Sequence, residues 1–275
     1  MQRKFIDMRF FGTYYFLNIV QGVGLDPFSY LRNLEGFWGD DLDVNFVQPF
    51  PKTSRLHDFA AFVIHGALDE ELDSEFESRS AAGSSKLWVE QAMDLYGLDY
   101  QSFGQWLEAT SSRMIVTATP EDASDYFTEL TLSEAYEQLL ERLSAEVFYH
   151  LFMNRAFLAK FNENIANIVI SEMDPAYLDS EVGNYFASPG VLRRVGLPAW
   201  VKNAVFFRDR GICVLCHCNL TGTINIQTDE NYDHIVPLAR GGMNDVSNIQ
   251  LLCETCNKTK SAGRSTTSSE YEAWY

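Results

Sequence analysis

The chain has 275 residues, 46% of them hydrophobic, and its 21 basic and 38 acidic side chains give a formal net charge of −17 at pH 7. This composition is typical of a globular protein and excludes collagen-like, coiled-coil and wholly disordered chains. No run of about 18 uncharged apolar residues is present, so no membrane span is predicted. The N-terminal residues also lack the small-residue cleavage site of a signal peptide.

The negative charge is concentrated in the first two thirds of the chain. Residues 1–192 contain 12 lysines and arginines against 30 aspartates and glutamates, whereas residues 193–275 contain 9 against 8. An acidic surface repels a phosphate backbone, and a near-neutral one does not. We therefore expect two domains, 1–192 and 193–275, of which only the second approaches nucleic acid directly.

The first half of the chain contains several helical patterns. The apolar stretch 10–25 is interrupted by polar residues and is expected to form a buried helix or strand. Ser54 is placed to cap a helix over 55–76, followed by a polar loop over 78–85. A second helix is expected over 86–97 and ends in glycine.

The longest helical pattern of the chain follows a proline-containing helix start. Thr119 precedes a proline and two acids, the order of residues that favours a helix N-terminus. Thr131 and Glu134 have the spacing of a capping box. The pattern after them continues to about Met173, and its length predicts one break near Asn154. Residues 1–192 are therefore expected to form a mainly helical domain.

The C-terminal region has a different pattern. A short helix is expected between Pro198 and Gly211, strands over 221–227 and 232–237, and a final helix over 254–262. The order strand, strand, helix in this region and the helical first part together predict an α+β fold class.

All five cysteines lie in this region, at positions 213, 216, 218, 253 and 256. They include two Cys-x-x-Cys pairs, Cys213 with Cys216 and Cys253 with Cys256, separated by 36 residues. Four thiolates satisfy a tetrahedral zinc ion, and a closed site of this kind is structural. A redox pair is the rival interpretation, but the surrounding sequence lacks a thioredoxin-like βαβ pattern.

The zinc assignment leaves one ambiguity and implies a compartment. His217 and Cys218 follow the first pair directly and offer alternative ligands, although the matching spacings favour the four cysteines of the two pairs. Unpaired cysteines clustered as metal ligands are typical of reducing compartments, so we expect a cytoplasmic protein.

A motif that resembles a known nuclease family lies between the two cysteine pairs. It reads Asp233-His234-Ile-Val-Pro, then Gly-Gly, then Asn248-Ile-Gln-Leu-Leu, then Cys-x-x-Cys-Asn257. This order resembles the HNH endonucleases, in particular the branch stabilised by zinc through two Cys-x-x-Cys pairs. The lead-in over 198–211 resembles that family as well. The resemblance covers about a quarter of the chain, implies a ββα-metal fold for 193–275 and says nothing about residues 1–192.

The residue types suit hydrolysis of a phosphodiester. A histidine with a pKa near neutrality removes a proton from water, which makes His234 the candidate general base. The resemblance implies that Asp233 and Asn257 hold one divalent cation, and that Asn248 orients His234 and its loop. The family often has histidine at the last position. Because an amide oxygen stands there in this chain, we expect Mg²⁺ or Mn²⁺, with another divalent transition metal as the alternative.

Two further expectations concern geometry and substrate. Adjacent strand residues point to opposite faces, so Asp233 and His234 share one site only at a strand end or twist. Arg240, Lys258, Lys260 and Arg264 are candidates for phosphate contacts, with ordinary surface charge as the alternative.

These observations lead to two competing functions for the C-terminal region. The first is a metal-dependent endonuclease, for which DNA is the expected substrate rather than RNA. The second is a non-catalytic zinc-stabilised module that binds nucleic acid or protein. Residues 1–192 are expected to mediate regulation, homo-oligomerisation or binding of a protein partner, because their charge disfavours contact with DNA. A role in defence against foreign DNA is a hypothesis from family analogy alone.

Overall fold

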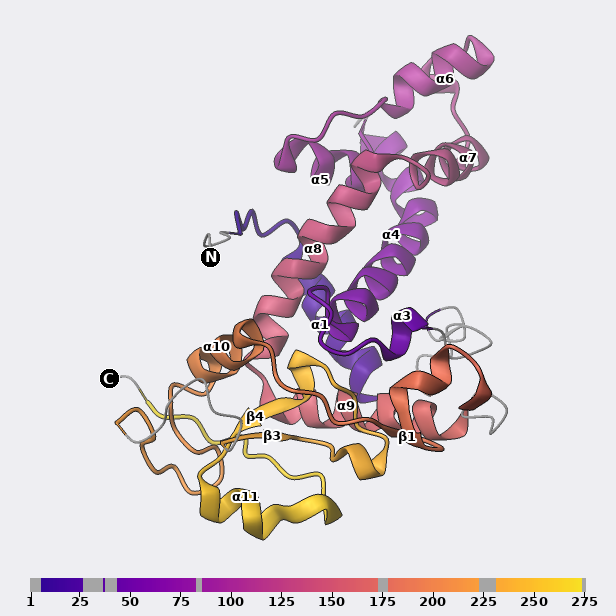
Figure 1. Ribbon diagram of the computed structural model, residues 1–275. Helices are drawn as coiled ribbons and strands as arrows, with labels where there is room; N and C mark the ends of the chain where they lie inside the picture. The colour runs from indigo at the N-terminus through magenta and orange to yellow at the C-terminus, as the bar shows by residue number, and fades with distance from the viewer. Residues whose placement is uncertain are drawn as a thin grey trace. The chain divides into compact units, whose positions relative to one another are not determined.

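The computed structural model describes residues 6–26, 37, 44–82, 86–172, 178–222 and 231–273 (Figure 1). Its α-helices are α1 (Thr13–Leu25), α3 (Val44–Val47), α4 (Arg55–Ala82), α5 (Trp88–Tyr96), α6 (Phe103–Ser111), α7 (Pro120–Leu130), α8 (Glu134–Phe152), α9 (Arg155–Ser171), α10 (Ala199–Arg208) and α11 (Glu254–Lys260). Its strands are β1 (Phe186–Ser188), β2 (Val191–Leu192), β3 (Tyr232–His234) and β4 (Ile249–Leu251). The α+β class and the mainly helical first part are therefore confirmed.

The chain divides into two compact units that do not coincide with the predicted domains. The first unit contains residues 1–20 and 57–148, and the second contains residues 21–56 and 149–275. The boundaries fall within α1, α4 and α8. Thus α9 belongs to the same unit as the C-terminal motif, although it precedes residue 193. The domain boundary at 192/193, which was inferred from the change in charge, stays a prediction.

The first unit is a helical assembly around an apolar core. Its fully buried side chains include Phe59, Met93, Phe103, Tyr126 and Leu139. Buried carboxylates join separate segments within this core. Glu146 of α8 accepts hydrogen bonds from the Thr13 hydroxyl at 2.5 Å and the Tyr96 hydroxyl at 2.9 Å. Because these donors satisfy the carboxylate, its burial is compatible with a stable core.

The helix boundaries follow the predicted signals, with two corrections. Thr119 caps α7, as predicted. The predicted break near Asn154 is also present, because α8 ends at Phe152 and Asn154 accepts from Phe157 N at the start of α9. Thr131, however, ends α7 and does not cap α8, because Ser133 Oγ accepts from Tyr136 N at 3.2 Å instead. The predicted loop over 78–85 is helical as far as Ala82, since its alanines continue α4 favourably.

Two further helix features differ from the sequence-based predictions or cannot be compared with them. Helix α6 was not predicted, although Ser102 and Gln105 form a capping box at its start. Helix α9 ends at Ser171, and the predicted end of the helical pattern at about Met173 falls outside the described residues.

The second unit contains two small antiparallel sheets. β1 pairs with β2 in a hairpin that was not predicted from the sequence. β3 pairs with β4, with Tyr232 opposite Leu251 and His234 opposite Ile249. Most of the predicted strand over 221–227 lies outside the described residues. The predicted strand over 232–237 is present as the shorter β3, and the predicted final helix is present as α11, whereas β4 was not predicted (Figure 1).

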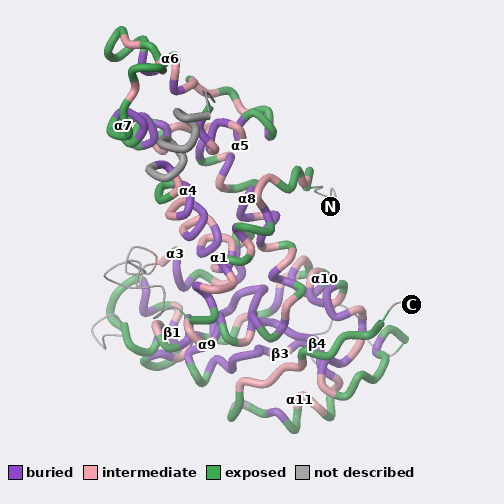
Figure 2. Tube along the Cα trace, turned by 180° about the vertical axis from the view of Figure 1, so that it is seen from behind, coloured by how far each residue is buried: buried purple, intermediate pink, exposed green. Residues whose placement is uncertain are grey.

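Burial differs sharply between the parts of this module. All three residues of β4 are buried, and α11 is largely exposed with Lys260 as its buried residue (Figure 2). The sheet therefore belongs to the core of the second unit. Among the described residues, no helix combines the length and apolarity needed to cross a membrane.

Candidate zinc and nuclease site

The four cysteines of the two Cys-x-x-Cys pairs converge, as their spacing predicted. The sulfurs of Cys213, Cys216, Cys253 and Cys256 all lie within 4.8 Å of one another. Sγ of Cys216 lies 3.7 Å from Sγ of Cys253. Sulfurs at about 2.3 Å from a tetrahedral zinc are about 3.8 Å apart, whereas a disulfide bond is about 2 Å long. The donor set therefore fits a structural zinc ion.

Backbone hydrogen bonds shape both cysteine turns. Cys213 O accepts from His217 N at 2.9 Å, and Cys213 N donates to Cys218 O at 3.0 Å. In the second turn, Cys253 caps α11 by accepting from Cys256 N at 3.4 Å. Each turn directs two sulfurs to a single point. The turns thus bring the four sulfurs into one cluster.

The protonation of the thiols depends on the ion. In its absence, burial and the neighbouring thiols raise the pKa of Cys256 above its ordinary value. A bound dication reverses this effect, because it stabilises thiolates strongly. Metal binding therefore releases protons and contributes to folding of the module.

Residues 217 and 218 are not members of the four-ligand set found among the described residues. His217 Nε2 lies 3.5 Å from Glu270 Oε2, and both side chains are exposed. Cys218 is exposed overall. Desolvation of its thiol and a hydrogen bond with the Cys216 thiol raise the pKa of Cys218 to about 12. The structure thus favours the predicted set over the alternatives.

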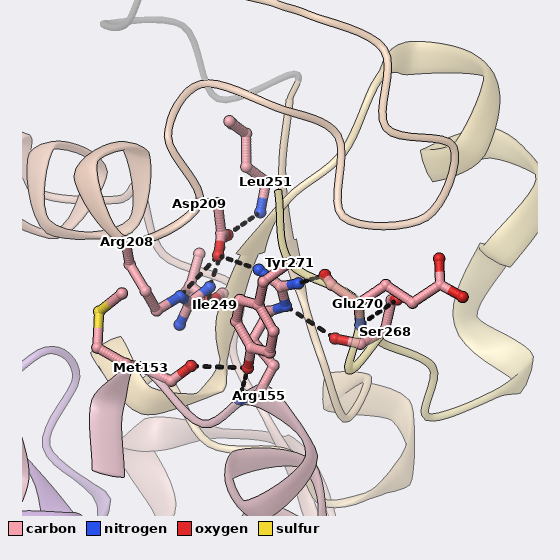
Figure 3. Close-up of polar contacts among 9 residues, drawn as sticks. All are labelled: Met153, Arg155, Arg208, Asp209, Ile249, Leu251, Ser268, Glu270 and Tyr271. Carbon is pink, nitrogen blue, oxygen red and sulfur yellow. Dashed lines mark hydrogen bonds and ion pairs between the residues drawn. The ribbon is translucent and has the colours of Figure 1, made fainter. Parts of the chain in front are cut away.

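A buried charge network connects α9, the zinc-site lead-in and β4 (Figure 3). Asp209 accepts from Arg208 at 2.8 and 2.7 Å and from Leu251 N at 3.0 Å. The Arg208 guanidinium also donates to Ile249 O at 2.7 Å. Arg155 of α9 adds a second cation, 3.4 Å from the same carboxylate. This network fixes β4 against the helix that leads into the first cysteine turn.

The same arginine attaches the C-terminal segment to α9. The Arg155 guanidinium donates to Ser268 O at 2.8 Å and lies 4.0 Å from the centre of the Tyr271 ring. Its backbone N–H donates to the Tyr271 hydroxyl at 2.8 Å, and that hydroxyl donates to Met153 O at 2.7 Å (Figure 3). The segment after α11 is thereby held across the second unit.

Asp233 and His234 lie at the C-terminal end of β3. At a strand end the two adjacent side chains need not point to opposite faces of the sheet. Oδ2 of Asp233 lies 2.7 Å from Nζ of Lys260, and this ammonium also donates to His234 O at 2.7 Å. The Lys260 side chain is 1% exposed. Lys260 therefore lies inside the site and not on the surface, so this arrangement does not present it to a phosphate backbone.

Asn248 ties together the two ends of the loop between β3 and β4. It is fully buried, and its Oδ1 accepts from Val236 N at 2.9 Å. Its Nδ2 donates to Val236 O at 3.0 Å and to Met243 O at 2.9 Å. The side chain thus satisfies backbone groups on both sides of the loop.

The glycine pair of the motif allows this loop to turn tightly. Gly241 has φ +77°, and a Cβ there would lie 2.7 Å from Ala166 O of α9. A Cβ on Gly242 would lie 2.0 Å from Val236 O. Side chains at these positions are therefore excluded by backbone conformation at the first and by backbone contact at the second.

His234 is almost fully enclosed and neutral. It is 3% exposed, and its Nε2 lies 3.2 Å from Oδ1 of Asn244. Burial lowers the pKa of His234 to about 4, and the Arg194 and Lys260 cations act in the same direction. A pKa this low keeps the imidazole in the neutral form that accepts a proton, but it lies below the near-neutral value expected from the sequence, which makes the ring a weaker base.

The remaining predicted site residues are arranged around α11. Asn257 is half-buried and precedes Lys260 by three positions, which places the two on one helix face. Lys258 is exposed and forms an ion pair with Glu254. Arg240 and Arg264 are exposed. An open groove of about 430 Å³ runs beside this helix and is lined by Cys256, Lys260, Arg264 and Thr266 among others.

One known protein family matches the segment that contains this site. The family described as HNH endonuclease matches residues 213–263, which span both cysteine turns, β3, β4 and α11. The C-terminal region is an HNH module. Searches of curated proteins and of solved structures gave no match to the chain. The family assignment therefore concerns this module, and residues outside 213–263 have no assigned relative.

The structure also adds residues to the HNH module that sequence reasoning missed. Asn244 at His234 and Arg155 at Asp209 were not singled out, because neither belongs to a spaced motif. Arg155 lies 58 positions before the matched segment. Their roles follow only from side-chain contacts across the fold.

Proposed function

We propose that this chain is a metal-dependent endonuclease that hydrolyses phosphodiester bonds, with DNA as substrate rather than RNA. The single observation that carries the proposal is the placement of Asp233 and His234 at the end of β3, against Lys260 of α11, within an HNH module. The proposed base and the proposed oxygen ligand for a cation are therefore neighbours at one edge of the module. The alternative, a zinc-stabilised binding module without catalysis, requires neither group.

His234 is the proposed general base. Its low pKa keeps the imidazole neutral at physiological pH, so a ring nitrogen is available to take the proton from the attacking water. Asn248 holds the loop that follows His234 through Val236 and Met243. Because a small displacement of a base lowers its efficiency, this loop is proposed to keep the imidazole in place.

Asp233 and Asn257 are proposed to hold a divalent cation of the Mg²⁺ or Mn²⁺ class. The donor set fits, because one carboxylate and one amide oxygen leave most coordination positions to water and phosphate oxygens. Such a cation supplies charge stabilisation at the scissile phosphate and leaving oxygen. Lys260 neutralises Asp233 through its ion pair, so the ammonium competes with a cation for this carboxylate.

Arg240, Lys258 and Arg264 are proposed to contact the phosphate backbone. All three are exposed, and Arg264 lines the groove beside α11. For Lys260 the buried ion pair supports a role inside the site instead. A reducing, cytoplasmic location belongs to the same proposal, because the zinc site requires unoxidised thiols.

The decisive test compares the full chain with His234→Ala on plasmid DNA and on RNA, with Mg²⁺, Mn²⁺ and Ni²⁺. We expect cleavage by the wild type and a loss of at least about 100-fold in the variant, the usual contribution of a general base. Asn203→Ala, an exposed position on α10, is the control for folding. Equal inactivity of both proteins under every condition, with DNA binding retained, would instead support the binding module.

Residues 1–192 are proposed to restrain access to nucleic acid, or to bind a protein partner or a second copy of the chain. The support is their excess of acidic residues. Replacing the exposed Glu121, Asp125, Glu137 and Glu141 by their amides in the full chain tests the electrostatic part. Cleavage at low salt should increase severalfold, and the increase should disappear near 1 M salt, where the screening length is about 3 Å. An unchanged rate would exclude charge restraint, and sedimentation analysis of the full chain would test oligomerisation.

A further inference from the structure

The side chain that faces the candidate base belongs to a loop held by segments outside the family match. Oδ1 of Asn244 lies 3.2 Å from Nε2 of His234, and Asn244 is 4% exposed. Nδ2 of the same amide donates to Arg193 O at 2.9 Å. The backbone oxygen of Asn244 accepts from Phe50 N at 2.7 Å. Three separate segments thus meet at this residue.

The hydrogen bonds determine which ring nitrogen of His234 carries the proton. A backbone carbonyl only accepts, so the amide of Asn244 must direct its NH₂ group toward Arg193 O. Its oxygen then faces the imidazole. Because an amide oxygen also only accepts, Nε2 of His234 must be the protonated nitrogen. Nδ1 keeps the lone pair.

We propose that Asn244 is a positioning residue that fixes His234 as the Nε2–H tautomer and so makes Nδ1 the atom that accepts the proton of the attacking water. This inference deepens the proposed nuclease function and rests on it for its catalytic consequence. The tautomer itself rests on hydrogen bonds alone. Neighbouring contacts support the rigidity of the loop: Asp245 Oδ2 accepts from Arg55 N at 2.9 Å, and Asn162 of α9 donates to Ser247 Oγ at 3.3 Å.

The hairpin β1–β2 holds the backbone carbonyl that orients the Asn244 amide. Arg193 follows β2 directly, and its N–H donates to Tyr185 O at 2.8 Å. The carbonyl that orients the Asn244 amide is therefore held by backbone pairing of the hairpin. A segment of the chain that precedes the matched HNH residues thus helps to set the base.

The tautomer is measured by NMR on the full, zinc-loaded chain with ¹⁵N- and ¹³C-labelled histidine, without added divalent cation, at pH 7.5. His234→Gln identifies the His234 signal among the 5 histidines. We expect the Nε2–H form in the wild type and in Asn244→Asp, which retains an acceptor. In Asn244→Leu, which has similar volume and no acceptor, we expect a mixture of both tautomers.

Cleavage provides the second measurement. Asn244→Leu should lower kcat about 10- to 100-fold, the usual cost of removing a group that orients a functional histidine. KM should change less than about twofold, because Asn244 does not contact substrate. Asn203→Ala serves as the exposed control. A wild-type Nδ1–H tautomer, or an unchanged tautomer and kcat in Asn244→Leu, would overturn the proposal. If Asn244→Leu does not fold, the wild type and Asn244→Asp still decide the tautomer.

The two proposals fail in different ways. A chain that cleaves neither DNA nor RNA but shows the Nε2–H form would overturn the nuclease function and leave the hydrogen-bond assignment intact. A chain that cleaves nucleic acid but shows the Nδ1–H form would leave the nuclease function intact and overturn the hydrogen-bond assignment. The NMR measurement therefore separates an error in the positioning role from an error in the function.

Discussion

Lys260 and Asp233 form an ion pair whose Nζ and Oδ2 atoms are 2.7 Å apart, at the point where α11 meets the end of β3. The lysine side chain is 1% exposed and the aspartate 15% exposed. The ammonium occupies the position from which a divalent cation would also be attracted to this carboxylate. Lys260 is therefore both a stabilising partner and a competitor of the proposed cation.

Replacing Lys260 by Met should strengthen Mn²⁺ binding and weaken the metal-free fold. We expect about a tenfold gain in affinity, because the competing ammonium is removed. The unpaired Asp233 should cost roughly 3 kcal/mol of stability, and Mn²⁺ should restore it. Calorimetric titration and urea unfolding measure these effects. Lys258→Met, on the exposed face of α11, is the control, and equal Mn²⁺ affinities in the two variants would contradict the competition.

Zinc should be essential for the folded module. We expect about one zinc ion per chain, removed by Cys253→Ser or by a strong chelator together with loss of cooperative unfolding of this region. Elemental analysis and thermal unfolding measure both. Cys218→Ser is the matched control and should keep its zinc, because Cys218 lies outside the four-sulfur cluster. Loss of zinc in Cys218→Ser would show that the ligand set is different.

Arg155 should hold the C-terminal segment in place. Arg155→Met removes the hydrogen bond to Ser268 O and the cation over the Tyr271 ring, and leaves Asp209 paired with Arg208 and the Leu251 N–H. We expect a loss of roughly 2 kcal/mol in unfolding free energy, the usual contribution of hydrogen bonds made by a charged group, because Arg208 still neutralises Asp209. Residues 268–273 should also become sensitive to proteases. Lys160→Met, exposed on the same helix, is the control, and equal protection of the segment in both variants would refute the attachment.

The burial of His234 should appear as a pH dependence of stability. Its folded pKa is lowered to about 4 from 6.5, so the folded state favours the neutral ring. The stability from this preference is complete above pH 6.5 and is lost as the pH falls toward 4. The full shift corresponds to roughly 3 kcal/mol.

Urea unfolding of the wild type and of His234→Gln between pH 7.5 and 4 measures this effect. The comparison cancels the acid-induced loss of zinc, which both proteins share. The stability advantage of the wild type should shrink as the pH falls. A constant difference across this range would show that His234 is not held in its neutral form.

Several features of this protein were determined by local sequence. The Cys-x-x-Cys turns predict the zinc cluster because each turn is self-contained and directs its own two sulfurs. Thr119 predicts a helix start because a cap acts within three residues of its position, and the length of the pattern after it predicts the break near Asn154. The HNH module is predicted by the order of Asp233-His234, the glycine pair, Asn248 and Asn257, because these residues lie in one continuous segment.

Other features were decided by tertiary structure alone. Lys260 looked like a surface charge, yet the packing of α11 against β3 buries it beside Asp233. Asn244 carries no motif, and its importance comes from Arg193 and Phe50, which lie far from it in sequence. Likewise, the charge boundary at residue 193 did not show that α9 shares a compact unit with the module. Contacts of this kind depend on which segments fold together, and no local pattern encodes that choice.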